Sequence, residues 1–242
     1  MVIRARGVLL DIEGTTSSIR YVYDVLVPFA RKNLRNFLQR RWSDPAVQRA
    51  CETIARDAGA ASFKAWTTGL DEVAQREKVA TEVERLMDAD VKATGLKELQ
   101  GLIWDEGYSA GKLTSHVYPD VAPALKRWAG QGRDIRIYSS GSVAAQKVFF
   151  KNTDVGDLTV YLRGHYDTTT GPKRDPASYA NIVADMNMPA QQILFASDVV
   201  AELDAAKTAG LQTVLVIRPG NAPQPPGHKH DAIETFDALE LA

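Results

Sequence analysis

Two carboxylates stand close together at the end of the first apolar run of the sequence. The run Gly7–Leu10 leads directly into Asp11, and Glu13 follows two positions later. Side chains two apart on an extended segment face the same space, so both carboxylates could act on one substrate. Ligands of open α/β sheets bind at such strand ends. A solvated acidic loop is the alternative, and this pair alone does not decide between the two.

Two later segments carry groups that suit the oxygens of a phosphate. Ser139 and Ser140 follow the apolar run 135–138, and their hydroxyl and backbone N–H groups could bind phosphate oxygens. Lys173 ends the turn Thr170-Gly171-Pro172-Lys173, where its ammonium could act as a point charge. Each segment by itself is more typical of an ordinary turn or a surface lysine, so the prediction depends on the segments meeting at one place.

Another pair of carboxylates follows the apolar run 193–197. Asp198 stands at the predicted strand end, and Glu202 comes four residues later. The two would lie on the same face of a helix that begins there. Asp198 could instead cap that helix, with Glu202 as a surface charge. The pattern leaves both interpretations open.

The elements that must position these groups alternate along the chain. Short runs rich in Val, Ile and Leu predict parallel strands covered on both faces, at residues 7–11, 135–141, 193–198 and 213–220. Helical patterns stand between them, at Pro123–Trp128 and at Val199–Ala209 before Gly210. This alternation predicts an α/β fold whose core is a doubly wound, mostly parallel sheet.

The interval 17–116 differs, because it has helical periodicity and no convincing strand. One apolar face is predicted from Val22, Leu26, Phe29, Leu34 and Phe37. Helices are predicted from Ser43-Asp44-Pro45 through Ala58, at Lys78–Ala89 and at Leu96–Trp104. We therefore predict a helical domain at residues 17–116, inserted into an α/β core of residues 1–16 and 117–242.

The composition is that of an ordinary globular protein. The 242 residues are 24% charged and 45% hydrophobic, and the net charge of −1 gives no sign of a nucleic-acid partner. The single cysteine, Cys51, cannot form an internal disulfide and fits a reducing compartment. No run is long enough to span a bilayer and the first residues lack an export signal, so we expect a cytoplasmic protein without a membrane partner.

Taken in order, the four polar segments resemble the motifs of the haloacid dehalogenase superfamily. The resemblance implies that Asp11 is a covalent nucleophile and Glu13 the acid and base two residues later. It further implies that Ser139 and Lys173 bind phosphate and that Asp198 binds a metal ion. The helical insert is similar to the cap domain that many members carry after the first motif.

A closer resemblance is to the acireductone synthases, the enolase-phosphatases of methionine salvage. It rests on the strings LLDIEGTTSSI, YSSGSVAAQKVFF, GHYDTTTGPK, SDVVAELDAAKTAG and VIRPGN. Glu13 followed by Gly-Thr-Thr is typical of this family, since most phosphatases of the superfamily have Asp there. The implied reaction is enolisation and dephosphorylation of 2,3-diketo-5-methylthiopentyl 1-phosphate to the acireductone 1,2-dihydroxy-3-keto-5-methylthiopentene, through an aspartyl-phosphate on Asp11.

The same resemblance implies the cofactor and the state of assembly. One Mg²⁺ per subunit would be held by the carboxylates of Asp11 and Asp198 and the main-chain oxygen of Glu13, because Mg²⁺ prefers oxygen ligands and keeps several waters. Ser140 could contact the substrate beside Ser139. A monomer is the expectation of the family.

The residues leave several alternatives open. A capped phosphatase of another small phosphate ester, without enolisation, is the first alternative, and a catalytically silent binding protein is the second. The residues do not identify the base of the enolisation. His165 and Asp167 are interpreted as structural loop residues, and His228 and His230 as members of an exposed Pro/Gly-rich segment rather than metal ligands.

Overall fold

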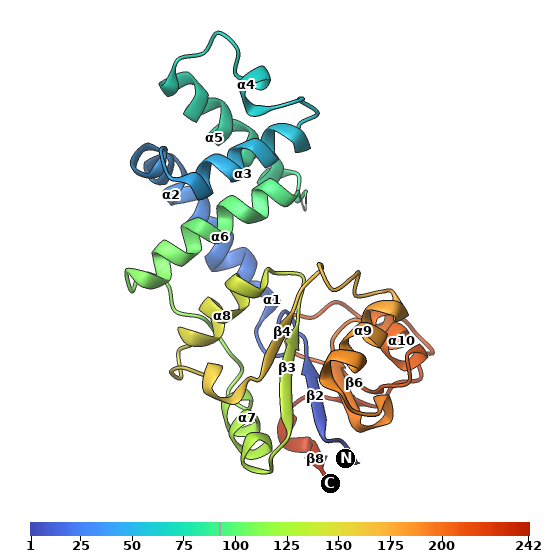
Figure 1. Ribbon diagram of the computed structural model, residues 1–242. Helices are drawn as coiled ribbons and strands as arrows, with labels where there is room; N and C mark the ends of the chain where they lie inside the picture. The colour runs from blue at the N-terminus through green and yellow to red at the C-terminus, as the bar shows by residue number, and fades with distance from the viewer. Residues whose placement is uncertain (92) are drawn as a thin grey trace. The chain divides into compact units, whose positions relative to one another are not determined.

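The computed structural model describes residues 1–91 and 93–242 and divides into two compact units (Figure 1). One unit consists of Met1–Val22 and Thr114–Ala242, and the other of Tyr23–Leu113. The predicted domain limits at residues 17 and 116 and the role of the insert as a cap stay predictions. Position 92, which falls within the predicted insert, lies outside the described residues.

A parallel sheet forms the centre of the first unit. Its six strands lie in the order β4-β3-β2-β5-β6-β7, and the neighbours pair in parallel. The strands are β2 (Gly7–Leu10), β3 (Asp134–Tyr138), β4 (Gly164–Tyr166), β5 (Ile193–Ser197), β6 (Gln212–Val216) and β7 (Ala232–Ile233). Every residue of β2 and β5 is buried, as central strands covered on both faces require. The predicted α/β fold with a parallel sheet is confirmed.

The register of the central strands brings the motifs to one edge. Leu10 at the end of β2 pairs with Ile137 of β3 on one side and with Ala196 of β5 on the other. Asp11, Ser139 and Asp198 therefore follow these strands at nearly the same level, at the carboxyl edge of the sheet.

Helices cover the sheet on both sides. In Figure 1, α7 and α8 lie to the left of the strands and α9 and α10 to their right. On the α9 and α10 side, Leu9, Tyr138, Phe195 and Leu215 share a buried cluster with residues of the two helices. The helices of this unit are α1 (Ile19–Tyr21), α7 (Val121–Gly130), α8 (Val143–Lys151), α9 (Pro176–Met186) and α10 (Val200–Thr208). The helices predicted at Pro123–Trp128 and Val199–Ala209 are confirmed as α7 and α10 with slightly different ends.

A smaller ladder joins the two ends of the chain. β1 (Val2–Ile3) pairs in parallel with β8 (Glu240–Leu241).

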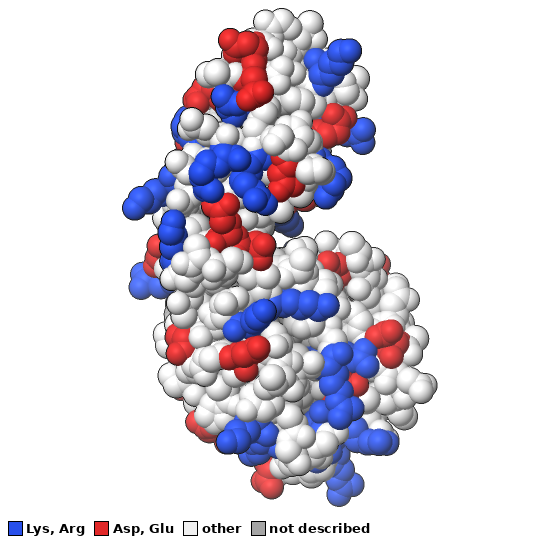
Figure 2. Space-filling view, turned by 60° about the vertical axis from the view of Figure 1, so that its left-hand side comes forward, with Lys and Arg blue, Asp and Glu red and all other residues white. Residues whose placement is uncertain are grey.

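On the face drawn in Figure 2, basic and acidic side chains are interspersed with uncharged ones. Among the described residues, none of the helices is both long and apolar enough to cross a membrane.

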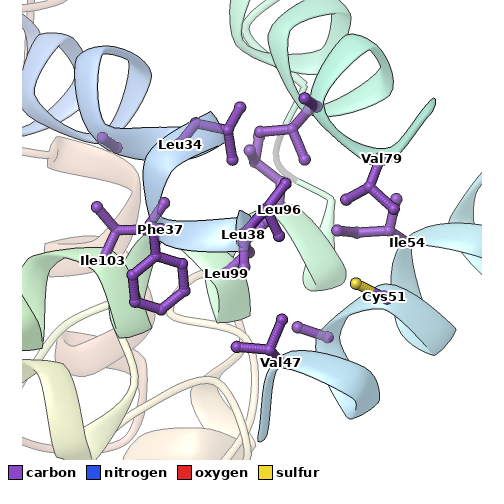
Figure 3. Close-up of a cluster of buried hydrophobic side chains, with 14 of the residues drawn as sticks. Leu34, Phe37, Leu38, Val47, Cys51, Ile54, Val79, Leu96, Leu99 and Ile103 are labelled. Atoms are coloured by element: carbon purple, nitrogen blue, oxygen red, sulfur yellow. The ribbon is translucent and has the colours of Figure 1, made fainter. Parts of the chain in front are cut away.

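The second unit is helical, as predicted, and has its own core (Figure 3). A π-helical turn at Val22–Leu26 leads into α2, and the further helices are α2 (Val27–Arg41), α3 (Pro45–Asp57), α4 (Phe63–Trp66), α5 (Glu72–Asp88) and α6 (Thr94–Ser109). Leu26, Leu34 and Phe37 of the predicted apolar face are buried. The predicted start of α3 at Ser43-Asp44-Pro45 is confirmed, and the side chain of Asp44 caps the helix by accepting a hydrogen bond from the Ala46 N–H.

Two of these helices begin or end beyond their predicted bounds. Asp71 caps α5 by accepting from the Ala74 N–H, so the helix begins before the predicted Lys78. α6 continues past the predicted end at Trp104 to Ser109.

Cys51 of α3 is fully buried in the core of the second unit. Burial raises the pKa of its thiol to about 12, which fits a packing role.

Candidate active site

Asp11 is buried at the first position after β2, and its carboxylate is held on both oxygens. Its N–H donates to the Ala196 carbonyl at 3.0 Å, which extends the sheet pairing by one residue. Oδ1 accepts from the Ile12 N–H at 2.7 Å and lies 2.8 Å from the Lys173 ammonium. Oδ2 accepts from the Ser197 hydroxyl at 3.3 Å. The side chain is thus fixed at the carboxyl edge of the sheet, where a substrate can meet it.

Lys173 joins Asp11 to a second carboxylate. Its Nζ lies 2.6 Å from Oε2 of Glu202, and the side chain of Lys173 is only 9% exposed. Burial alone would lower the pKa of this ammonium, but the charges of Asp11 and Glu202 more than offset burial and raise the pKa. The alternative of a solvated surface lysine is wrong for this residue, because its charge lies inside a cluster of carboxylates.

The turn that carries Lys173 is tied to the neighbouring elements through its backbone. The Tyr138 hydroxyl donates to the Gly171 carbonyl at 2.8 Å, and the Ser178 hydroxyl donates to the Pro172 carbonyl at 2.8 Å. The Tyr179 hydroxyl donates to the Lys173 carbonyl at 2.7 Å. These three bonds connect the turn to β3 and α9, so the ammonium is positioned by rigid elements.

Asp198 lies against the turn that follows Asp11. Gly14 has a φ of +71°, and a Cβ at this position would lie 2.3 Å from Oδ2 of Asp198, so only glycine leaves room for the carboxylate. Burial, followed by the charges of Asp11 and Glu202, raises the pKa of Asp198 to about 7. The alternative that Asp198 caps α10 is wrong, because the cap position is Val199 and the helix has no side-chain cap bond.

Glu13 and Ser139 form a second pair at the same edge. The Ser139 hydroxyl is fully buried and donates to Oε2 of Glu13 at 3.1 Å. Burial and the nearby charge of Asp11 raise the pKa of Glu13, which favours its protonated form and suits a general acid. Ser140 is the next residue and is exposed, so its contact with substrate stays a prediction.

The donor set fits a divalent cation with oxygen ligands. Lys173 pairs with the carboxylates of Asp11 and Glu202, and burial together with the charges of these two carboxylates raises the pKa of the nearby Asp198 although the charge of Lys173 acts in the opposite direction. A bound cation would offset this excess of negative charge. Within the described residues, no hydrogen bond reaches the Glu13 carbonyl, whereas those of Ile12 and Gly14 accept bonds. No group of three His, Cys, Asp or Glu side chains that could hold a metal occurs in that part of the chain. Two carboxylates, one carbonyl and waters are the ligand pattern of Mg²⁺.

Comparison with known proteins agrees with this geometry. Residues 5–210 match the haloacid dehalogenase-like hydrolase family. The chain is 45% identical over 240 residues to the enolase-phosphatase E1 of Stenotrophomonas maltophilia (strain R551-3), covering 98% of this chain and 99% of that protein. The chain belongs to the enolase-phosphatase E1 family of haloacid dehalogenase-like hydrolases. The resemblance noted in the sequence is thereby confirmed, and the chain is a phosphatase-type enzyme.

The chain is also similar to a further enolase-phosphatase E1 and to two proteins of solved structure. The Drosophila melanogaster enolase-phosphatase E1 is 43% identical over 218 residues, with 90% of this chain and 85% of that protein covered. A crystal structure of the UTR4 protein from Saccharomyces cerevisiae is 34% identical, with a TM-score of 0.78 over 98% of this chain and all of that one. A crystal structure of a dehalogenase, 17% identical with a TM-score of 0.56, covers 97% of this chain and 95% of that chain and shares the fold.

Two expectations about histidines need correction in this family member. His165 is a residue of strand β4 and not of a loop, because the edge strand Gly164–Tyr166 pairs with β3. His230 is buried and not exposed, since its Nδ1 lies 2.8 Å from the Thr213 hydroxyl and its Nε2 lies 3.0 Å from Asp204. His228 and His230 stack on each other with ring centroids 6.5 Å apart.

The structure also shows site residues that sequence reasoning missed. Arg218 donates through Nε to the Thr15 carbonyl at 3.1 Å and pairs with Asp120 at 2.8 Å. Asn221 donates through Nδ2 to the Gly14 carbonyl at 2.9 Å. The string VIRPGN, which contributes to the resemblance, contains both residues. No local pattern in the sequence indicated that this string contacts the turn after Asp11, because the two segments are about two hundred positions apart.

Proposed function

We propose that this enolase-phosphatase E1 family member converts 2,3-diketo-5-methylthiopentyl 1-phosphate to the acireductone 1,2-dihydroxy-3-keto-5-methylthiopentene and phosphate, in methionine salvage. The observation that supports the proposal is the arrangement at the carboxyl edge of the sheet, where Asp11 is held by Lys173 and Glu13 by Ser139. A fixed nucleophile beside a carboxyl group of raised pKa is what phosphoryl transfer through an aspartyl-phosphate requires. The substrate and the pathway come from the family resemblance.

Asp11 is the nucleophile of the first half-reaction. One carboxylate oxygen forms a bond to phosphorus while the bond between phosphorus and the substrate oxygen breaks. Glu13 gives its proton to that leaving oxygen, and the raised pKa of Glu13 makes the proton available. Enolisation precedes this step and moves a proton from C1 of the substrate to the oxygen at C2, through a base that the residues do not identify. The products of the phosphoryl transfer are then an aspartyl-phosphate on Asp11 and the dephosphorylated enediol.

Glu13 acts as a base in the second half-reaction. Its carboxylate takes a proton from a water molecule, whose oxygen forms a bond to phosphorus. The bond between phosphorus and Asp11 then breaks, which releases phosphate and restores both side chains. Lys173 and the hydroxyl of Ser139 hold the phosphate oxygens while negative charge is redistributed over these oxygens. Ser140 would contact the substrate.

One Mg²⁺ per subunit fits this site through Asp11, Asp198 and the main-chain oxygen of Glu13. When bound, Mg²⁺ offsets the repulsion between the phosphate and the carboxylate of Asp11. The helical segment 17–116 would act as a cap that excludes water from the reaction. A cytoplasmic monomer remains our prediction for the working form.

The test combines two assays on the purified protein under anaerobic conditions. With the diketo phosphate and Mg²⁺, we expect a new ultraviolet absorbance from the enediol and an equal amount of released phosphate. Asp11→Asn should lower the release of phosphate, and with it the formation of the dephosphorylated enediol, by on the order of 10⁴-fold, because an amide is a poor nucleophile. Asp154→Asn replaces an exposed aspartate of the same unit and should leave both rates unchanged.

The possible outcomes test the enolase step, the aspartyl-phosphate and the enzymatic activity itself separately. Phosphate release from other esters without the absorbance change would remove the enolase step and leave a phosphatase of another small ester. Normal turnover by Asp11→Asn would refute the aspartyl-phosphate. Absence of Mg²⁺-stimulated phosphate release from every ester tested would favour a binding protein.

A further inference from the structure

Gln146 is a buried amide directly behind the turn that carries Ser139. It lies in the second turn of α8 and is only 2% exposed. Its Nε2 donates to the Gly141 carbonyl at 2.8 Å and to the Tyr166 carbonyl at 2.8 Å, with a longer contact of 3.5 Å to the Ser139 carbonyl. An amide nitrogen has two protons, so the two short bonds use its full donor capacity. One side chain thus joins the end of β4 to the turn after β3.

The direction of this amide is set by a fourth contact. Because Nε2 must face the carbonyls, Oε1 faces Nδ1 of His165 at 3.2 Å. An amide oxygen only accepts hydrogen bonds, so Nδ1 of His165 carries a proton and donates it. Burial, with a smaller effect from the charge of Lys147, lowers the pKa of His165 to about 4, so the ring is neutral at neutral pH. The contact with Oε1 of Gln146 then selects the tautomer that has its proton on Nδ1.

The backbone of the turn depends on the same groups. The Ser139 N–H donates to the Tyr166 carbonyl at 3.2 Å, so Gln146 shares this acceptor with the residue that it supports. The Ser139 hydroxyl is the donor to Glu13. A shift of the turn would therefore move the hydroxyl away from both Glu13 and a bound phosphate. Displacements of about 1 Å at such a contact can lower a rate by about 10²-fold.

We propose that Gln146 is a positioning residue that holds the Ser139 hydroxyl in its working place, and that His165 fixes the orientation of the Gln146 amide. This inference rests on the proposed function, in which Ser139 binds a phosphate oxygen beside Glu13. Gln146 belongs to the string YSSGSVAAQKVFF and His165 to the string GHYDTTTGPK. Neither side chain touches the reacting atoms, and the inference gives both a role.

Two variants of Gln146 separate positioning from packing. Gln146→Glu keeps the shape but places a carboxylate oxygen opposite the carbonyls of Gly141 and Tyr166, and Gln146→Met keeps the volume without any donor. We expect kcat to fall by about 10-fold to 100-fold in both. Inhibition by orthovanadate, a phosphate analogue, should weaken by at least about 10-fold, whereas the Mg²⁺ concentration for half activity should stay the same.

Substitutions of His165 test the second half of the proposal. His165→Asn retains a donor near the position of Nδ1 and should keep kcat within about threefold, whereas His165→Leu removes the donor and should lower kcat by about 10-fold. His230→Leu is the matched control, because it removes a buried histidine near the opposite edge of the sheet. It should lower the thermal midpoint without changing kcat of the folded enzyme.

The inference is overturned if both Gln146 variants keep kcat and vanadate inhibition within twofold while only the thermal midpoint falls. It is also overturned if His165→Asn and His165→Leu lose the same activity. Its failure can be told from failure of the proposed substrate, because the comparison works with any ester that wild type hydrolyses. If wild type neither turns over an ester nor binds vanadate by calorimetry, the inference and the proposed function fall together.

Discussion

The ammonium of Lys173 lies 2.8 Å from Oδ1 of Asp11. The same ammonium contacts Glu202, so one buried cation serves two carboxylates that would otherwise repel each other. The proposed nucleophile therefore depends on a lysine for its place as well as for its charge. A phosphate that enters the site meets a cation already oriented by the protein.

Removal of this cation should affect both stability and activity. In Lys173→Met, the buried carboxylates of Asp11 and Glu202 lose their partner, and we expect the free energy of unfolding to fall by on the order of 3–5 kcal/mol. Thermal denaturation measures this change, and phosphate release should be lost as well. Lys147→Met, at an exposed lysine of α8, is the control and should have little effect on either. Unchanged stability of Lys173→Met would contradict the buried cluster.

Gly14 should control how the site binds Mg²⁺. In Gly14→Ala, the new Cβ would collide with the Asp198 carboxylate, and we expect the affinity for Mg²⁺ to fall by about 10-fold to 100-fold. Calorimetry and the Mg²⁺ dependence of phosphate release both measure the affinity. Gly132→Ala is the matched control, because Gly132 has a similar φ of +77° and no atom within 4 Å of the added Cβ. Equal effects of the two substitutions would show that backbone strain alone is responsible.

The buried pair of Arg218 and Asp120 should stabilise the fold and the Asp11 turn together. The Arg218 guanidinium lies 4.4 Å from the centre of the Tyr118 ring and donates to the Thr15 carbonyl. Asp120→Leu leaves this charge unpaired and should cost about 3–5 kcal/mol in chemical denaturation. The double variant Asp120→Leu/Arg218→Met should recover part of that stability without recovering full activity, because Thr15 loses its donor.

An exposed ion pair provides the comparison for this experiment. Arg31 and Asp88 are 39% and 68% exposed, so Asp88→Asn should change stability by less than about 1 kcal/mol. If Asp120→Leu has an equally small effect, the pair of Arg218 and Asp120 does not hold the two segments together.

His165 should make stability depend on pH in a defined direction. Its pKa is lowered from 6.5 to about 4 in the folded protein, so the unfolded chain binds the proton more readily. The contribution of His165 to stability is therefore present above about pH 6.5 and is lost as the pH falls toward 4. The free energy of unfolding of wild type minus that of His165→Asn should decrease over this interval, as measured by urea denaturation. A difference independent of pH would contradict the lowered pKa.

The sequence alone predicted the α/β class, four of the strands, the helical character of the insert and the family. These features follow from local signals, such as the apolar run before Asp11 and the cap at Asp44, which depend on neighbouring residues. Strand β4 was missed because it has only three residues, among them a glycine and a histidine, and lies at the edge of the sheet. His230 was misplaced because a Pro/Gly-rich segment gives no local sign that one of its side chains enters the core.

The identities of the groups at the site were readable in the sequence, but the tertiary structure alone decided which of them touch. Ser139 and Glu13 are 126 residues apart, and Arg218 and Asp120 are 98 apart. Their contacts arise from the strand order and register, which bring distant loops to one edge of the sheet. The hydrogen bonds of Gln146 and the two ion pairs of Lys173 arise in the same way, because the sheet brings their segments together. Contacts of this kind depend on how the whole chain packs, and no local pattern of residue types specifies them.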